Sequence, residues 1–345
     1  EVLNWPRHAS VRMDFESALV AVVTIGLGLH TGSGWAFTPL LALFLWGYIG
    51  QADTSLTGRL KCWVGRSVVR GLLPLLAIFV AFLVVQALAE QLSLRPILIV
   101  LAYLLVPFGL AHVHLWLWPA RKSLQLTVPL LLAILCLWLP IEVGLMPEVK
   151  LPPGNGVPVA YLLGLAGALY LFQVVIGLDG VGYTYRLGVR DWSLSVVHFS
   201  IFLAMIGVPL AVSLDFIRTS QDIAPLWSWP LRGLYIFFFI AVPEEILFRG
   251  ILHNLLQRRL AGRLWSALIL SSLVFGLAHS NNSNPPYAAV HLPLVGVVEL
   301  PWVYILLATI AGVFYGLAYV RSGKLTTAAL VHAMVDLWWS VFFHG

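Results

Sequence analysis

Two neighbouring glutamates and an arginine lie inside a long apolar segment of this sequence. Residues 242–249 read VPEEILFR, so apolar side chains surround Glu244, Glu245 and Arg249. In a helix, Glu245 and Arg249 share one face with the acid first, which is the favourable order for an ion pair. Glu244 points about 100° away from Glu245, so we expect it to be available for another partner. The plainer interpretation is a buried ion pair that only fixes helix packing.

Two histidines lie in apolar segments further along the chain. His279 ends the run FGLAH, and Phe275 precedes it by one helical turn, where it can pack against the imidazole. His332 and Asp336 are also four residues apart, on one face of the last apolar segment. A carboxylate one turn from an imidazole can orient the ring and fix its tautomer. Taken singly, a histidine at a span end such as His279 is more often interfacial, and the His332–Asp336 pair is equally well explained as a local hydrogen-bonded pair.

The three segments are more informative together. A charge inside a membrane span costs about 2.5–3.5 kcal/mol on insertion scales, and such charges face the bundle interior and find one another. The residue types suit hydrolysis. A carboxylate can act as general base for water, and an imidazole can donate to the developing oxyanion. A second histidine can position the water or protonate the leaving amine, so neither a serine nor a cysteine nucleophile is needed.

The composition indicates that lipid is the solvent for most of the surface. Of the 345 residues, 60% are hydrophobic and 10% are charged, against about 25% charged in soluble domains. The mean hydropathy is +0.92. At about 20 apolar residues per span, we predict an all-α, polytopic helix bundle with about 10–11 spans. The net charge of +5 is spread over short loops, so we expect no nucleic-acid partner.

The apolar runs divide the chain into predicted helices without the alternation of a β-barrel. These runs are 17–30, 35–50, 71–90, 96–118, 124–145, 157–178, 193–214, 230–257, 264–279, 301–320 and 325–343. Residues 280–298 are predicted to form an irregular loop. We divide the chain into N-terminal transmembrane helices without a recognisable motif, residues 1–229, and a catalytic transmembrane core, residues 230–345.

The basic residues lie in every second loop after residue 50. Because cytoplasmic loops are rich in Lys and Arg, we expect the N-terminus inside, the C-terminus outside, and a multi-pass protein of the bacterial inner membrane. Two cysteines make a disulfide framework unexpected. The basic clusters are Arg59, Lys61, Arg66 and Arg70; Arg121 and Lys122; Arg186 and Arg190; Arg258, Arg259 and Arg263; and Arg321 and Lys324.

These motifs resemble those of the CPBP family, which includes CAAX prenyl endopeptidases and bacteriocin-processing or immunity proteins. The family signature is EExxxR, FxxxH and HxxxN or HxxxD, and the resemblance covers roughly residues 230–345. It implies an intramembrane protease in which Glu244 activates water. It also implies that Glu245 and Arg249 form a supporting pair, and that Phe275 belongs to the FxxxH motif.

The resemblance assigns the histidines to the reaction as well. His279 and His332 would bind water or stabilise the oxyanion, with Asp336 orienting His332. Asp336 stands where the prenyl endopeptidases have Asn. An Asn can donate to an oxyanion and an ionised Asp cannot, so the resemblance does not assign Asp336 the role of that Asn.

We expect a glutamic-type enzyme without a metal, and zinc is the alternative. His279, His332 and Glu244 would then be the ligands, although there is no HExxH motif and Glu244 would no longer be the base. The expected partners are membrane lipid and a peptide or membrane-anchored protein substrate, whose identity and prenylation stay open. Other functions are a non-catalytic immunity or scaffold protein, and a proton-coupled transporter. A transporter would predict repeats or paired broken helices.

Overall fold

The computed structural model describes residues 15–31, 37–119, 124–150, 156–157, 159–219, 223, 225–282, 285–292 and 296–344. The predicted basic positions Arg121 and Lys122 lie outside this set. The chain forms two compact units, one of residues 1–115 and 135–177 and the other of residues 116–134 and 178–345. The predicted division at residue 230 marked where recognisable motifs begin, and it stays a prediction. By contacts, residues 178–229 group with the C-terminal helices.

The helices before residue 178 follow the apolar runs, with one addition. Residues 54–64, treated above as part of a basic loop, form a helix. Asp53 caps this helix by accepting a hydrogen bond from the Ser55 amide, and Gly65 ends it with a φ of 55°. Its polar composition hides it from a search for apolar runs. The elements are α1 (Phe15–Thr31), α2 (Thr38–Ile49), η2 (Gly50–Ala52), α3 (Thr54–Val64), α4 (Val68–Leu88), α5 (Leu94–Leu117), α6 (Val128–Glu142), β1 (Val149–Lys150), β2 (Gly156–Val157), α7 (Val159–Leu169) and the π-helical η4 (Tyr170–Val175).

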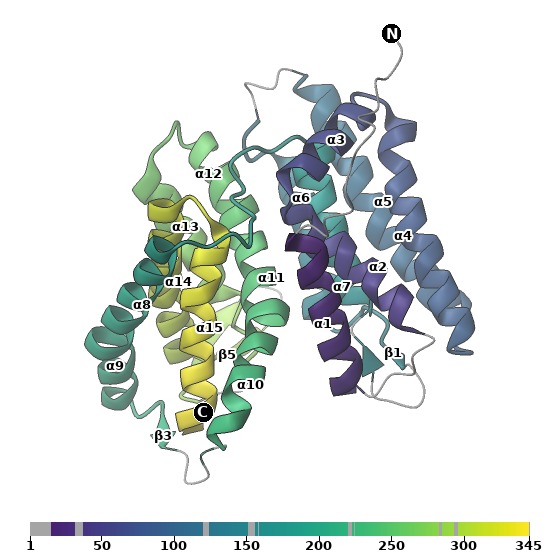
Figure 1. The fold of residues 1–345 in the computed structure, drawn as a ribbon. Helices are drawn as coiled ribbons and strands as arrows, with labels where there is room; N and C mark the ends of the chain where they lie inside the picture. Colours follow the sequence, from purple (N-terminus) through teal and green to yellow (C-terminus); the bar gives the residue numbers. More distant parts are fainter. Residues whose placement is uncertain are drawn as a thin grey trace. The chain divides into compact units, whose positions relative to one another are not determined.

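The C-terminal unit is a bundle in which α8, α14 and α15 pack on one another and α13 packs on α14 (Figure 1). The run predicted at 230–257 is one continuous helical stretch, and two of its segments are π-helical. The elements after residue 178 are α8 (Val189–Phe202), η5 (Leu203–Gly207), α9 (Val208–Ser213), β3 (Arg218–Thr219), η6 (Leu226–Ser228), α10 (Trp229–Ile236), η7 (Phe237–Ala241), α11 (Val242–Glu245), η8 (Ile246–His253), α12 (Asn254–Arg259), α13 (Leu264–Leu277), β4 (Ala288–Leu292), β5 (Gly296–Leu300), α14 (Trp302–Ser322), α15 (Leu325–Phe342) and β6 (Phe343–His344).

The segment 280–298 corrects a second prediction. It was expected to be irregular, but β4 and β5 pair as an antiparallel hairpin from Ala288 opposite Leu300 to Leu292 opposite Gly296. The asparagines and prolines of residues 281–286 concealed the short strands that follow them.

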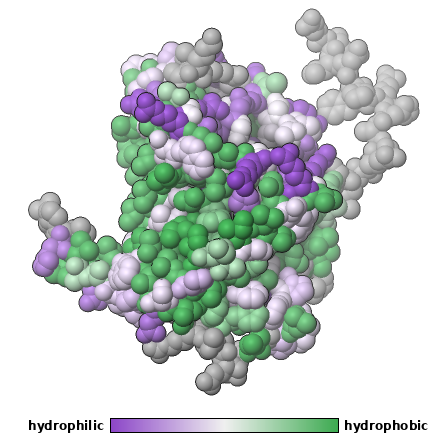
Figure 2. Space-filling view, turned by 90° about the vertical axis from the view of Figure 1, so that its left-hand side faces the viewer, coloured by the Kyte–Doolittle hydropathy of each residue, from purple (hydrophilic) through white to green (hydrophobic). Residues whose placement is uncertain are grey.

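The all-α, polytopic class is confirmed, and the chain is an integral membrane protein. Among the described residues, five helices are long and apolar enough to cross a membrane: Val68–Leu88, Leu94–Leu117, Val189–Ser213, Trp302–Ser322 and Leu325–Phe342. Four shorter apolar helices accompany them, so the count of 10–11 spans stays a prediction. The face in Figure 2 is mostly hydrophobic. On α8 and α13, large apolar side chains such as Trp192, Ile201, Trp265 and Leu273 are exposed, as expected for helices that face lipid.

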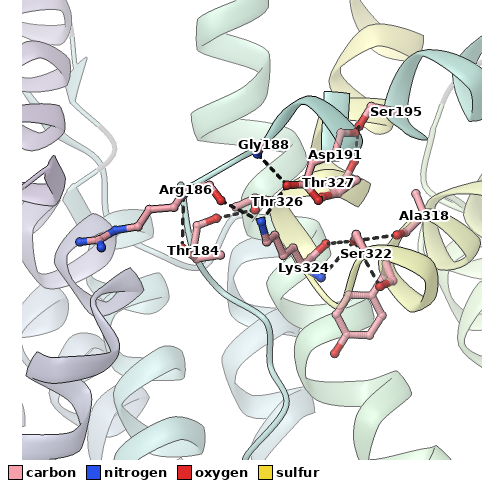
Figure 3. A network of polar contacts seen from close by, with 11 residues as sticks. Thr184, Arg186, Gly188, Asp191, Ser195, Ala318, Ser322, Lys324, Thr326 and Thr327 are labelled. Atoms are coloured by element: carbon pink, nitrogen blue, oxygen red, sulfur yellow. Dashed lines mark hydrogen bonds and ion pairs between the residues drawn. The ribbon is translucent and has the colours of Figure 1, made fainter. Parts of the chain in front are cut away.

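A polar network holds the start of α15, the helix that carries His332 (Figure 3). Gly323 ends α14 with a φ of 71°, a left-handed conformation that glycine adopts without steric cost. Lys324 then donates to Asp191 Oδ2 at 2.7 Å and to the carbonyl of Arg186 at 2.9 Å. The same Asp191 oxygen accepts from the Gly188 amide at 2.8 Å. The turn before α15 is therefore anchored to the start of α8.

The first turn of α15 is anchored as well. Thr326 donates through Oγ1 to the carbonyl of Thr184 at 2.5 Å, and Ser195 donates through Oγ to the carbonyl of Thr327 at 3.1 Å. Both threonines of α15 are fully buried. Since a helix is stiff over one or two turns, these bonds fix the rotation of α15 and thus the direction in which His332 points.

Candidate active site

Glu245 and Arg249 form a fully buried ion pair within the helical run 229–259. Glu245 Oε1 lies 2.8 Å from Arg249 Nη1, and both side chains have no exposed surface. Arg249 also donates through Nη2 to the carbonyl of Gly312 on α14, at 2.7 Å. Its guanidinium lies over the Phe275 ring, 4.6 Å from the centroid. A buried charge needs such partners because desolvation is costly, so this pair ties the helical run to α13 and α14.

The imidazole of His332 lies among three carboxylates. Its Nδ1 is 3.1 Å from Glu245 Oε1, while its Nε2 is 3.3 Å from Asp336 Oδ2 and 3.8 Å from Glu244 Oε2. The His332 side chain is 4% exposed, whereas those of Glu244 and Asp336 are 32% and 33% exposed. An imidazole with protons on both nitrogens can donate on both sides. His332 therefore joins the buried ion pair to two accessible carboxylates.

Aromatic rings hold His332 in place. Tyr315 stacks on the imidazole with centroids 4.6 Å apart and ring planes at 15°. Phe275 meets the same imidazole edge-on at 5.6 Å. Both rings are buried. The imidazole is thus fixed by packing as well as by its hydrogen bonds.

His279 lies on the other side of Phe275. Its Nδ1 donates to the carbonyl of Phe275 at 2.8 Å, so a neutral His279 has its proton on Nδ1 and leaves Nε2 as an acceptor. Tyr304 stacks on the imidazole at 5.3 Å, and Phe275 contacts it at 4.8 Å. The Phe275 ring contacts both His279 and His332, and it therefore links the two imidazoles by packing.

The sequence-predicted residues gather in one place within the C-terminal unit. Phe275 contacts Arg249, His279 and His332, and His332 reaches the three carboxylates. Prediction missed the part played by α14, which supplies residues Tyr304, Gly312 and Tyr315. The two tyrosines are eleven residues apart, three helical turns, and therefore on one face. From that spacing the sequence could have predicted that the two tyrosines line one face of the helix. The sequence also did not reveal that Glu245 faces His332 as well as Arg249.

The residues proposed as zinc ligands do not form a metal site as they are arranged. In the described part of the chain, no group of three or more His, Cys, Asp or Glu side chains is placed to hold a metal ion. Of the three candidates Glu244, His279 and His332, the last has each ring nitrogen directed at a carboxylate. We therefore derive no chemical step through a metal.

Comparison with known proteins agrees with the location of this site. Residues 226–338 match the family model described as type II CAAX prenyl endopeptidase Rce1-like. An uncharacterized 24.3 kDa protein of Escherichia coli is 28% identical over 164 residues, which cover 46% of this chain and 63% of that relative. No solved structure matches the chain. The segment with the Glu244, His279 and His332 motifs thus matches an Rce1-like domain, which supports the resemblance to the CPBP family that the motifs indicate.

Proposed function

We propose that the chain is an intramembrane endopeptidase that hydrolyses peptide bonds of membrane-associated substrates with water activated by Glu244. One observation carries the proposal. The Glu244 side chain is partly exposed, and its Oε2, a buried oxygen without a hydrogen-bond partner among the described residues, lies 3.8 Å from His332 Nε2, next to a fully buried ion pair. A base that water can reach, beside a rigidly held imidazole, is the arrangement that hydrolysis requires.

In the proposed reaction, Glu244 takes one proton from water while the water oxygen attacks the scissile carbonyl. The resulting tetrahedral intermediate carries an oxyanion, and His332 donates to it through Nε2–H. His279 accepts a hydrogen bond from the other O–H of the water through Nε2, because its Nδ1–H is held by a backbone carbonyl, and that hydrogen stays on the attacking oxygen. The intermediate then collapses, the C–N bond breaks, and Glu244 returns its proton to the leaving amine.

The remaining residues position this machinery. Asp336 lies 3.3 Å from His332 Nε2 and holds that N–H until the oxyanion forms and replaces Asp336 as its acceptor. The Glu245–Arg249 pair holds His332 from the buried side through Nδ1. The proposed substrate is a peptide or membrane-anchored protein, and the proposed location is the bacterial inner membrane with the N-terminus inside.

Purified protein reconstituted in vesicles with a library of membrane-anchored reporter peptides, prenylated and unprenylated, tests this function. We expect cleavage by the wild type and by Glu90→Gln, a matched change at an exposed glutamate of the N-terminal unit. We expect none by Glu244→Gln, which keeps the side-chain shape but cannot take a proton. Folded wild-type protein that cleaves nothing in the library, or full cleavage by Glu244→Gln, would overturn the proposal.

A further inference from the structure

The β4–β5 hairpin is a sheet of two strands with unpaired outer edges. Its five residue pairs run from Ala288 opposite Leu300 to Leu292 opposite Gly296. Neither strand pairs with any third strand in the described part of the chain. Nor does a hydrogen bond join the backbone of either strand to another described segment. Each outer edge therefore presents free N–H and C=O groups, which form a template for another strand.

The side chains of the hairpin alternate between two faces. Cross-strand partners share a face, since side chains in a strand alternate with a period of two. One face is half-buried and apolar, and the other is exposed. The half-buried residues are Ala288, Val290, Val298 and Leu300, and the exposed ones are Ala289, His291, Val297 and Glu299. The hairpin thus has one half-buried apolar face and one exposed face.

The chain places the hairpin beside the candidate active site. β5 ends at Leu300, and Pro301 leads directly into α14, where Tyr304 stacks on His279 with centroids 5.3 Å apart. Only the three residues 301–303 separate Leu300 from Tyr304, and α14 begins at Trp302. On the other side of the hairpin, His279 lies two residues after the end of α13, the helix that precedes β4.

We propose that the outer edge of β5 binds an extended segment of the substrate as a third strand and delivers its scissile bond to Glu244 and His279. This inference rests on the proposed peptidase function. A peptidase must hold its substrate extended so that the scissile carbonyl is accessible, and strand addition does this through backbone hydrogen bonds. A two-stranded hairpin is marginally stable by itself, so a third strand also stabilises it. β5 is favoured over β4 because it is continuous with Tyr304.

An amide-to-ester scan of a reporter peptide cleaved by the wild type tests this mode of binding. An added strand bonds to the hairpin through every second residue. We therefore expect KM to rise roughly 2- to 10-fold at alternate positions over four or five residues, with kcat little changed. A uniform response along the peptide, or none, would overturn strand addition.

Disulfide trapping tests the choice of edge. In a Cys62→Ser, Cys136→Ser background with Glu244→Gln to prevent turnover, Glu299→Cys should crosslink to a single cysteine in the peptide. Neighbouring strands are about 4.8 Å apart, within the Cα range of a disulfide. The matched control is Ala289→Cys, the cross-strand partner of Glu299 on the same face, which lies one strand further from the peptide.

The outcomes separate this inference from the proposed function. Crosslinking at Glu299→Cys but not at Ala289→Cys supports β5 as the docking edge. Crosslinking at Ala289→Cys alone, or at neither position, overturns it even though the wild type cleaves the peptide. Absence of any cleavage by the wild type instead removes the proposed function on which the inference rests.

Discussion

Glu245 Oε1 lies close to two nitrogen partners, Arg249 Nη1 at 2.8 Å and His332 Nδ1 at 3.1 Å. Its neighbour Glu244 has the same chemical group with a third of its side chain exposed. Two adjacent carboxylates therefore have different environments because successive helical residues point about 100° apart. We expect the buried carboxylate to matter for stability and the accessible one for chemistry.

This difference predicts that Glu245→Gln destabilises the protein. The change leaves Arg249 buried without a negative partner, a loss of roughly 3–5 kcal/mol, and it also removes the acceptor for His332. Thermal unfolding in detergent should show a clearly lower Tm for Glu245→Gln than for Glu244→Gln. Equal Tm values for Glu245→Gln and wild type would contradict a structural role for the pair.

The two histidines should act as one unit. Phe275 contacts both rings, and His279→Ala and His332→Ala are each expected to lower kcat/KM by about two orders of magnitude or more, roughly the loss on removal of one preorganised oxyanion donor. The double variant should be little worse than either single one. Rate measurements on all three variants check this, and multiplying effects would indicate separate sites.

At the scale of elements, α14 contacts the site through a glycine as well as through tyrosines. A Cβ built on Gly312 would lie 3.0 Å from Arg249 Nη2 and 3.1 Å from Phe275. The Gly312 carbonyl also accepts from Arg249. A glycine here allows the helix backbone to approach a buried guanidinium.

We therefore predict that Gly312→Ala lowers both the Tm and the cleavage rate, because the added methyl pushes Arg249 and Phe275 apart. An overpacked core typically loses about 1–3 kcal/mol. The matched control is Gly109→Ala on α5, where nothing lies within 4 Å of the new methyl. Thermal unfolding and reporter cleavage compare the two. A Gly312→Ala variant as stable and active as the control would mean that α14 can shift freely.

At the scale of the whole molecule, metal content distinguishes the two mechanisms considered from the sequence. If Glu244 activates water without a metal, chelation should leave most of the activity, and elemental analysis should find far less than one metal ion per chain. Stoichiometric zinc, with activity lost on chelation and restored by zinc, would instead make Glu244 a ligand. An exposed-site control, Glu90→Gln, should behave like the wild type in either case.

Two expectations failed where local composition was misleading. Residues 54–64 are helical despite their basic and polar side chains, because Asp53 and Gly65 supply a start and an end. Residues 288–292 and 296–300 pair as a hairpin although asparagines and prolines precede them. In both places hydrogen bonds of the backbone, which composition does not report, decide the structure.

The sequence by itself determined the contacts between residues that are neighbours on the same helix. The pairs Glu245 with Arg249, Phe275 with His279, and His332 with Asp336 are each four residues apart, and helical geometry places such residues together. The apolar runs likewise determined the helical class, because a helix satisfies its own backbone in lipid. The preference of buried charges for one another predicted only that the three motifs would meet.

The tertiary structure decided which atoms meet. His332 approaches Glu245 across 87 positions of the chain, and Arg249 reaches the Gly312 carbonyl across 63. Tyr304 and Tyr315 stack on the two imidazoles only because α14 packs between α13 and α15. Such contacts depend on how helices pack and rotate against one another. No spacing within a single helix encodes that arrangement, so it could not be predicted from the motifs alone.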